Sequence, residues 1–138
     1  MSDAKDEILK KLNDFIDSSE NEMIFLESLL TKHKALSPEN GGDGEEEKAL
    51  ALEKWLKENG FTDIKRYNAP DSRVSCGYRP NIVVTIPGES DEYSVWCMSH
   101  LDVVPVGELS AWNTNPWEAV VKDGKIFGRG VEDNPDPL

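Results

Sequence analysis

The chain has 138 residues, enough for one domain that buries roughly two-thirds of the surface its unfolded form exposes. Its 27 acidic and 15 basic residues give a net charge of −12, which repels phosphate backbones and anionic membrane surfaces. We therefore expect neither nucleic acid nor membranes among its partners. The N-terminus is polar where a secretory signal needs an apolar centre, which favours a cytoplasmic location.

The first half of the chain shows helical periodicity. Apolar residues recur every three or four positions from Ala4 to about His33, which predicts one amphipathic helix that packs on a sheet. After a glycine-rich break, Glu45 to Glu47 favour the start of a second helix, which runs to about Asn59 and stops at Gly60. The expected buried stripe of this second helix consists of Ala49, Leu52, Trp55 and Leu56. Its remaining Glu and Lys residues are expected on a solvated face.

The middle of the chain is rich in strand formers. Phe61 to Tyr67 predicts a short strand, and Asn68 to Arg79 predicts a surface loop. The near-continuous apolar runs Asn81–Ile86 and Tyr93–Met98 predict two central strands. Strands of this kind need cover on both faces, yet the two predicted helices both precede them. A covering layer is therefore expected to be absent from this chain.

A histidine and an aspartate follow the second of these predicted strands. Side chains two positions apart in an extended segment point to the same side, so His100 and Asp102 are expected to converge at the carboxyl end of the strand. In this interpretation His100 is a metal ligand and Asp102 orients its imidazole. The simpler alternative is a histidine on the surface or in an ordinary hydrogen bond.

A second candidate site lies in residues 123–134, which read DGKIFGRGVEDN. The pattern predicts a turn, a short strand and a glycine-flanked bend that presents Asp133, because Gly128 and Gly130 tolerate unusual backbone angles. A carboxylate in such a place can bridge two zinc ions roughly 3.5 to 4 Å apart, which activate a shared water. The alternative is that Asp133 is a helix cap, because Asp or Asn before proline is a common helix start.

Three motifs in this order carry a family resemblance: HLDVVP from His100, AWNTNPW from Ala111, and DGKIFGRGVEDN from Asp123. The chain resembles the two-zinc peptidases and deacylases, which include acetylornithine deacetylase, succinyl-diaminopimelate desuccinylase, aminoacylase and glutamate carboxypeptidase. The resemblance runs from about Leu26 to Asn134 and is strongest from Met98 onward. It implies an α/β fold with a three-layer catalytic domain, of which residues 1–138 would be the N-terminal part.

The resemblance also implies roles for individual residues. His100 would ligate one metal, the catalytic residue Asp102 would support it, and Asp133 would bridge both ions. The cofactors would be two divalent ions, zinc by preference, with cobalt or manganese as alternatives. Trp112 and Trp117 would shape the loop beside the site. Arg129 and His33 have simpler expected roles, as an anchor for the bend and as a charge partner at a helix end.

Several parts of the family's site do not occur in these 138 residues. A Glu-Glu pair, a later acidic ligand, a C-terminal histidine and the lid or dimerisation domain would all follow Asp133. Catalytic zinc usually has three protein ligands, so we expect weak metal binding and negligible hydrolysis from this chain alone. Cys76 and Cys97 do not form a close pair, and buried or idle thiols are expected.

The sequence therefore predicts a metal-dependent hydrolase of amide bonds, either a peptidase or an N-acyl amino acid deacylase. Its partner would be a small N-acyl amino acid or a short peptide, and its full-length form would be a homodimer. The choice among these substrates stays open. The alternative function is a non-catalytic acidic interaction domain derived from the same fold, which the charge of −12 favours.

Overall fold

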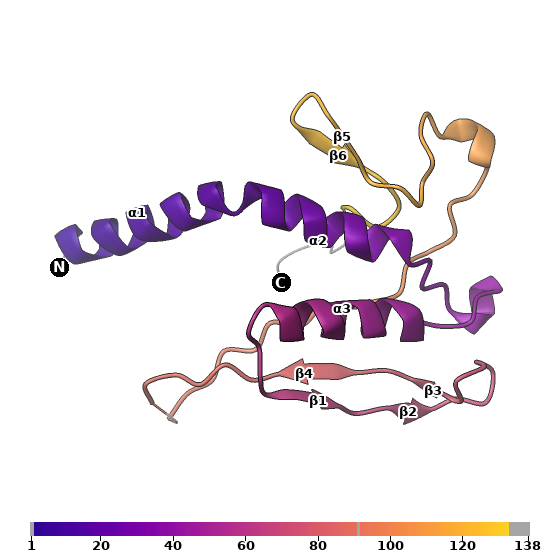
Figure 1. Cartoon of the computed structure of the whole chain (residues 1–138), viewed down its shortest axis with the longest axis horizontal. Coiled ribbons are helices and arrows are strands. Elements are labelled where there is room, and N and C mark those ends of the chain that lie inside the picture. The colour runs from indigo at the N-terminus through magenta and orange to yellow at the C-terminus, as the bar shows by residue number, and fades with distance from the viewer. Residues whose placement is uncertain (1, 91, 133–138) are drawn as a thin grey trace.

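The computed structural model describes residues 2–90 and 92–132. Helices α1 (Ser2–Ser18) and α2 (Glu20–Lys32) follow one another nearly in line (Figure 1). The prediction of a single helix is therefore wrong at one point, Ser19. The hydroxyls of Ser18 and Ser19 both donate hydrogen bonds to the carbonyl oxygen of Phe15, at 2.8 Å each. Such bonds compete with the regular backbone ladder and interrupt a helix.

The first helix does not pack on a sheet within the described residues, contrary to expectation. Its exposed apolar side chains are Ile8, Leu9, Leu12, Phe15 and Ile16. Helix α2 instead packs against α3 (Glu46–Glu58), and Figure 1 shows α3 between α2 and a β-hairpin. Among the described helices, none combines the length and the apolar character that a membrane span requires.

Helix α3 confirms the second predicted helix. Ala49 and Leu56 are buried, and Gly60 follows the helix with a left-handed φ of 87°. One expectation for this helix is wrong, because Lys48 is only 6% exposed and does not lie on a solvated face. Lys48 stands one helical turn before Leu52 and two turns before Leu56, so it shares the apolar stripe.

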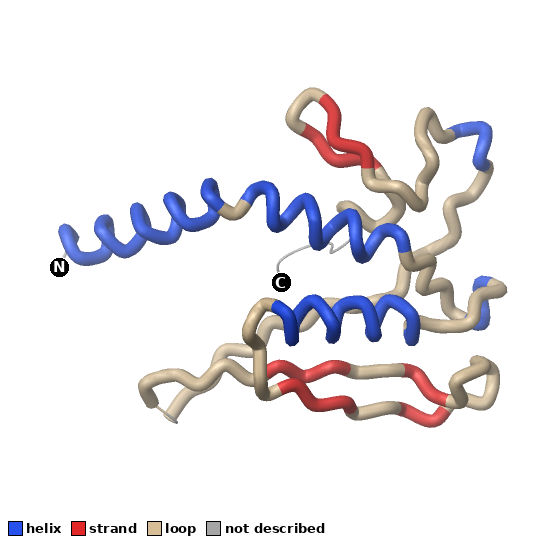
Figure 2. Tube along the Cα trace, viewed as in Figure 1, coloured by secondary structure: helices blue, strands red, loops and turns tan. Residues whose placement is uncertain are grey.

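The β-hairpin begins with β1 (Ile64–Arg66), which pairs antiparallel with β4 (Ile82–Val84), Ile64 facing Val84. Strands β2 (Ala69–Pro70) and β3 (Tyr78–Arg79) also pair antiparallel and extend the same hairpin (Figure 2). The predicted surface loop at 68–79 is thus the outer part of a hairpin. The two halves of this segment supply backbone hydrogen bonds to one another as antiparallel strands. The turn-forming residues in the sequence do not predict that pairing.

Ion pairs fasten this hairpin to α3. Arg66 in β1 donates to Glu53 at 2.5 Å and to both carboxylate oxygens of Glu46 at 2.9 and 2.8 Å. Arg79 in β3 forms a two-pronged contact with Glu45, the residue just before α3. Paired guanidinium and carboxylate groups of this geometry fix orientation as well as contributing energy.

The second predicted central strand does not form. Residues 93–98 are extended without strand pairing, and Tyr93, Val95 and Met98 are each more than 80% exposed. A strand needs a neighbour for its backbone groups, and the described residues place none beside this segment. The chain returns to the fold at Val103, whose N–H donates to the carbonyl oxygen of Ala35 at 3.1 Å.

The C-terminal hairpin consists of β5 (Val120–Lys122) and β6 (Lys125–Phe127), joined by Asp123 and Gly124. Both linking residues have positive φ, 52° and 70°, which is the backbone of a tight two-residue turn. The turn and short strand predicted here are confirmed. The mixture of helices and small sheets fits an α/β fold; the three-layer arrangement stays a prediction.

Candidate metal centre

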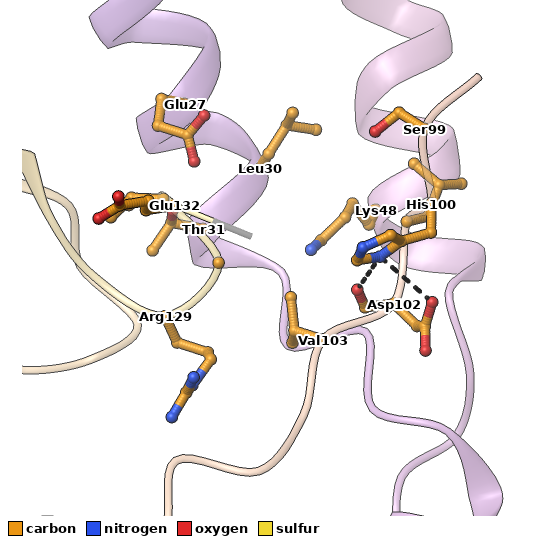
Figure 3. Close-up of a pocket in the computed structure, with 13 residues that line it drawn as sticks. Glu27, Leu30, Thr31, Lys48, Ser99, His100, Asp102, Val103, Arg129 and Glu132 are labelled. Carbon is orange, nitrogen blue, oxygen red and sulfur yellow. Dashed lines mark hydrogen bonds and ion pairs between the residues drawn. The ribbon is translucent and has the colours of Figure 1, made fainter. Parts of the chain in front are cut away.

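The two candidate residues after Met98 do converge. His100 Nδ1 lies 2.8 Å from the carbonyl oxygen of Asp102 and 3.5 Å from its Oδ1 (Figure 3). A carbonyl oxygen only accepts hydrogen bonds, so Nδ1 must carry the hydrogen. In the neutral imidazole the lone pair then lies on Nε2. This is the tautomer that leaves Nε2 able to bind a metal, while Asp102 holds the ring from behind.

Both side chains are accessible. The side chain of His100 is 43% exposed and that of Asp102 is 48% exposed. The backbone positions them because Val103, the next residue, is 6% exposed and is tied to Ala35. The segment is thus fixed immediately after the pair, although the residues before it are exposed.

The glycine-flanked bend lies on the opposite side of the same cavity. An added Cβ at Gly130 would lie 2.8 Å from Val103 Cγ1, and one at Gly128 would lie 3.0 Å from Thr31 Cγ2. Gly130 also has a φ of 87°, a conformation that favours glycine. The absence of side chains at these two positions therefore lets the bend approach α2 and the His100 segment closely. The prediction for Asp133 falls outside the described residues.

The cavity between these segments has a volume of about 330 Å³. Four separate parts of the chain line it: α2, α3, the segment 99–103 and the bend 129–132 (Figure 3). The polar side chains among them are Glu27, Thr31, Lys48, Ser99, His100, Asp102, Arg129 and Glu132. Sequence reasoning missed Glu27, Thr31 and Lys48. For Lys48 a signal existed, since its spacing from Leu52 and Leu56 places it on the buried stripe.

Electrostatics in the cavity involve Glu27 and Lys48. Burial raises the pKa of the Glu27 carboxyl group, and the positive charge of Lys48 acts in the opposite direction. Thr31 is 3% exposed, and its side chain also acts to lower the pKa of Glu27. The cavity wall opposite His100 is thus polar but poorly solvated, which strengthens charge interactions inside it.

The tryptophan segment packs beside this cavity. Trp112 follows the short 3-10 turn η2 (Leu109–Ala111), and its Nε1 donates to the carbonyl oxygen of Val106 at 2.9 Å. The Arg129 guanidinium lies over the Trp112 ring, 5.3 Å from its centroid. The Nζ of Lys34 lies over the Trp117 ring in the same way, 5.7 Å from the ring centroid.

The remaining histidine and the cysteines lie elsewhere. His33 follows α2, and its Nδ1 is 4.0 Å from a carboxylate oxygen of Glu47, in keeping with a charge partner at a helix end. Cys76 and Cys97 are free thiols. Cys97 is exposed rather than buried, because the strand expected around it does not form.

The described residues supply only part of a metal site. His100 offers Nε2 in the required tautomer, but no group of three or more His, Cys, Asp or Glu side chains capable of holding an ion occurs within 2–90 and 92–132. The donor chemistry therefore fits one protein ligand with its supporting carboxylate. Catalytic zinc usually needs three protein ligands, so any others would come from outside these residues.

Comparisons with known proteins agree with the resemblance. Residues 96–137 match the family model described as peptidase family M20/M25/M40. An uncharacterized metallohydrolase of Methanocaldococcus jannaschii is 44% identical over 117 residues, which is 82% of this chain and 28% of the relative. A succinyl-diaminopimelate desuccinylase of Parvibaculum lavamentivorans is 33% identical over 106 residues, 75% of this chain and 24% of the relative. No solved structure matches significantly.

These findings confirm the family read from the sequence. The chain belongs with the M20 peptidases and deacylases. It spans only about a quarter of the length of the relatives named above. The name of the Methanocaldococcus relative describes a metallohydrolase, and that of the Parvibaculum relative describes a desuccinylase.

Proposed function

We propose that the protein hydrolyses amide bonds in N-acyl amino acids or short peptides, with two divalent metal ions, zinc by preference, as cofactors. The observation that carries the proposal is the pairing of His100 with Asp102 at the edge of a polar cavity. The name of the desuccinylase relative supports N-succinyl amino acids as the first substrates to test. The catalytic domain would have the family's three layers, and the full-length protein would be a cytoplasmic homodimer.

Each residue has a distinct role in this proposal. His100 would hold one ion through Nε2, and the carbonyl oxygen of Asp102 keeps the Nδ1 hydrogen in place and so maintains the ligand tautomer. Asp133 would also hold metal, a role that rests on the family resemblance. When bound, the metal pair supplies a water that ionises near neutral pH and a Lewis acid for the scissile carbonyl.

The cavity contributes positioning and a low dielectric. Its volume of about 330 Å³ accommodates a small acyl or amino acid group next to His100. The buried wall formed by Thr31 and Lys48 keeps water away from one side of that group. We also propose that residues 1–138 alone bind metal weakly and show negligible hydrolysis, because the described residues contain one ligand of a site that needs three.

The test uses the full-length protein with His100→Ala and Asp102→Asn variants. We expect His100→Ala to lose hydrolysis of N-succinyl and N-acetyl amino acids and one equivalent of bound zinc. Asp102→Asn should weaken zinc binding or activity about 10-fold, because it removes the carboxylate charge 3.5 Å from Nδ1 but leaves the backbone carbonyl that Nδ1 contacts at 2.8 Å. Zinc content is measured by elemental analysis, and affinity by competition with a chelator.

His33→Ala is the matched control, because His33 pairs with Glu47 and lies at the end of α2. It should leave zinc content and hydrolysis unchanged. Normal zinc content and activity in His100→Ala would contradict the proposal. A folded wild-type protein that binds no metal would favour the non-catalytic acidic domain instead, which the family findings do not favour.

A further inference from the structure

One side chain touches both sides of the candidate site. We define the His100 arm as residues 99–106 and the glycine bend as residues 128–132. Trp112 donates its indole N–H to the carbonyl oxygen of Val106 in the His100 arm, at 2.9 Å. The face of the same ring receives the guanidinium of Arg129 from the glycine bend, at 5.3 Å. Trp112 thus joins two segments more than twenty residues apart in the sequence.

Two further contacts hold the segments together. The N–H of Arg129 donates to the carbonyl oxygen of Pro116 at 2.6 Å, which ties the bend to the tryptophan segment. Gly130 lies so close to Val103 that a Cβ there would be 2.8 Å from Val103 Cγ1. The arm and the bend therefore touch at Val103 and Gly130 and are joined through Trp112 a short distance away. Two separate points of contact fix the angle between the arm and the bend, which a single contact would leave free.

Arg129 has a feature that simple structural packing does not explain. Its Nε is buried without a hydrogen-bond acceptor among the described residues, and its guanidinium points away from His100 (Figure 3). A buried donor without an acceptor opposes folding. An apolar side chain of similar length at this position would avoid that cost. Replacing Arg129 by such a side chain should therefore change the free energy of unfolding little. The stacking on Trp112 is then the contact that the arginine specifically provides.

We propose that Trp112 and Arg129 are positioning residues that set the separation between His100 and the glycine bend. The inference rests on the proposed function, in which His100 from the arm and Asp133, the residue that follows the bend in the sequence, hold the metals. A ligand set tolerates displacements of only a fraction of an ångström, and misplacement by about 1 Å can lower a rate about 100-fold. The pair acts through other residues and does not touch the substrate.

The test replaces Arg129 by Met in the full-length protein. We expect zinc affinity to fall about 10-fold or more, as for other residues that support metal ligands. kcat should fall with it, KM should stay unchanged, and the visible spectrum of the cobalt-substituted protein should shift. The thermal unfolding midpoint should remain near that of the wild type. The signals of the His100 imidazole nitrogens in the metal-free protein should also move.

Conservative variants separate the two contacts of the ring. Arg129→Lys keeps a cation over Trp112 and should restore most of the zinc affinity. Trp112→Phe keeps an aromatic face but loses the hydrogen bond to Val106, and should give an intermediate value. Matched controls are Arg73→Met, which removes an exposed arginine of the β-hairpin, and Trp96→Phe, which alters a tryptophan that is 70% exposed. Both controls should retain the wild-type zinc affinity and the wild-type His100 imidazole signals.

The outcomes distinguish this inference from the proposed function. If wild-type protein hydrolyses no amide and binds no metal, the proposed function fails, but the His100 imidazole signals still report on the positioning. Unchanged His100 signals in both Arg129→Met and Trp112→Phe would overturn the inference. So would losses of zinc affinity that merely follow losses of thermal stability across the variants.

Discussion

The β-hairpin and the His100 arm differ in how their backbones are held. The hairpin of residues 64–84 has paired strands at both its inner and its outer end and is tied to α3 and the residue before it through Arg66 and Arg79. The segment before His100 has no strand partner among the described residues, and its apolar side chains are exposed. The backbone of the hairpin is held by strand pairing within the hairpin. The His100 arm depends instead on a few contacts with residues far away in the sequence.

Small changes should matter most in the His100 arm. The His100 arm is held at Val103, by its backbone contact with Ala35 and its packing on Gly130, and at Val106 by Trp112. We expect the loss of one of these few contacts to shift the whole arm. Many contacts hold the hairpin in place, so the loss of one of them should displace it less.

The largest expected effect is that of Gly130→Ala. The left-handed backbone costs alanine about 1–2 kcal/mol, and the overlap with Val103 adds about 1–3 kcal/mol. Denaturant unfolding of the full-length protein measures the loss. Gly124→Ala is the control, since its φ is 70° but an added Cβ meets no atom within 4 Å. Equal losses at both positions would show that the contact with Val103 is unimportant.

The next effect tests the packing of α3. Leu56→Ala removes a side chain that is 8% exposed and should lower the free energy of unfolding by about 2–3 kcal/mol, the lower part of the usual range for buried leucine. Leu50, on the same helix, is 52% exposed, so Leu50→Ala should change stability by less than about 0.5 kcal/mol. A large effect at Leu50 would mean that this face of α3 is covered in the full-length protein.

The smallest effect concerns the outer part of the hairpin and depends on pH. Hydrogen bonds from the side chain and backbone N–H of Arg73 lower the pKa of the Asp71 carboxyl group to about 2. Because the folded-state pKa is depressed, the stabilisation is present above the ordinary pKa of about 3.9 and disappears as the pH falls towards 2. Asp71→Asn should therefore be slightly less stable than the wild type at pH 7.

The stability difference between Asp71→Asn and the wild type should shrink as the pH is lowered and vanish only below about pH 2, the folded-state pKa of Asp71. Thermal unfolding at several pH values measures it. A difference that persists at the lowest pH would show that the charge of Asp71 is not its cause. The hairpin would then owe its outer end to backbone pairing between β2 and β3 alone.

Short-range patterns in the sequence predicted much of this protein. Helix α3 and its stop at Gly60, the first strand of the hairpin and the turn at Asp123 and Gly124 all follow from spacing and backbone preference. The spacing of His100 and Asp102 predicted their convergence, which the structure shows. Their metal-binding role stays a prediction, as does that of Asp133.

Other features were decided only by tertiary structure. The exposed run at 93–98 has the composition of a strand but lacks a partner, and composition does not report whether a partner is present. The burial of Lys48 and the contact of Trp112 with two distant segments arise from packing between elements. Sequence determines which residues favour each local shape, because those preferences act within a few residues. Which side chains meet across the cavity depends on contacts between segments far apart in the chain.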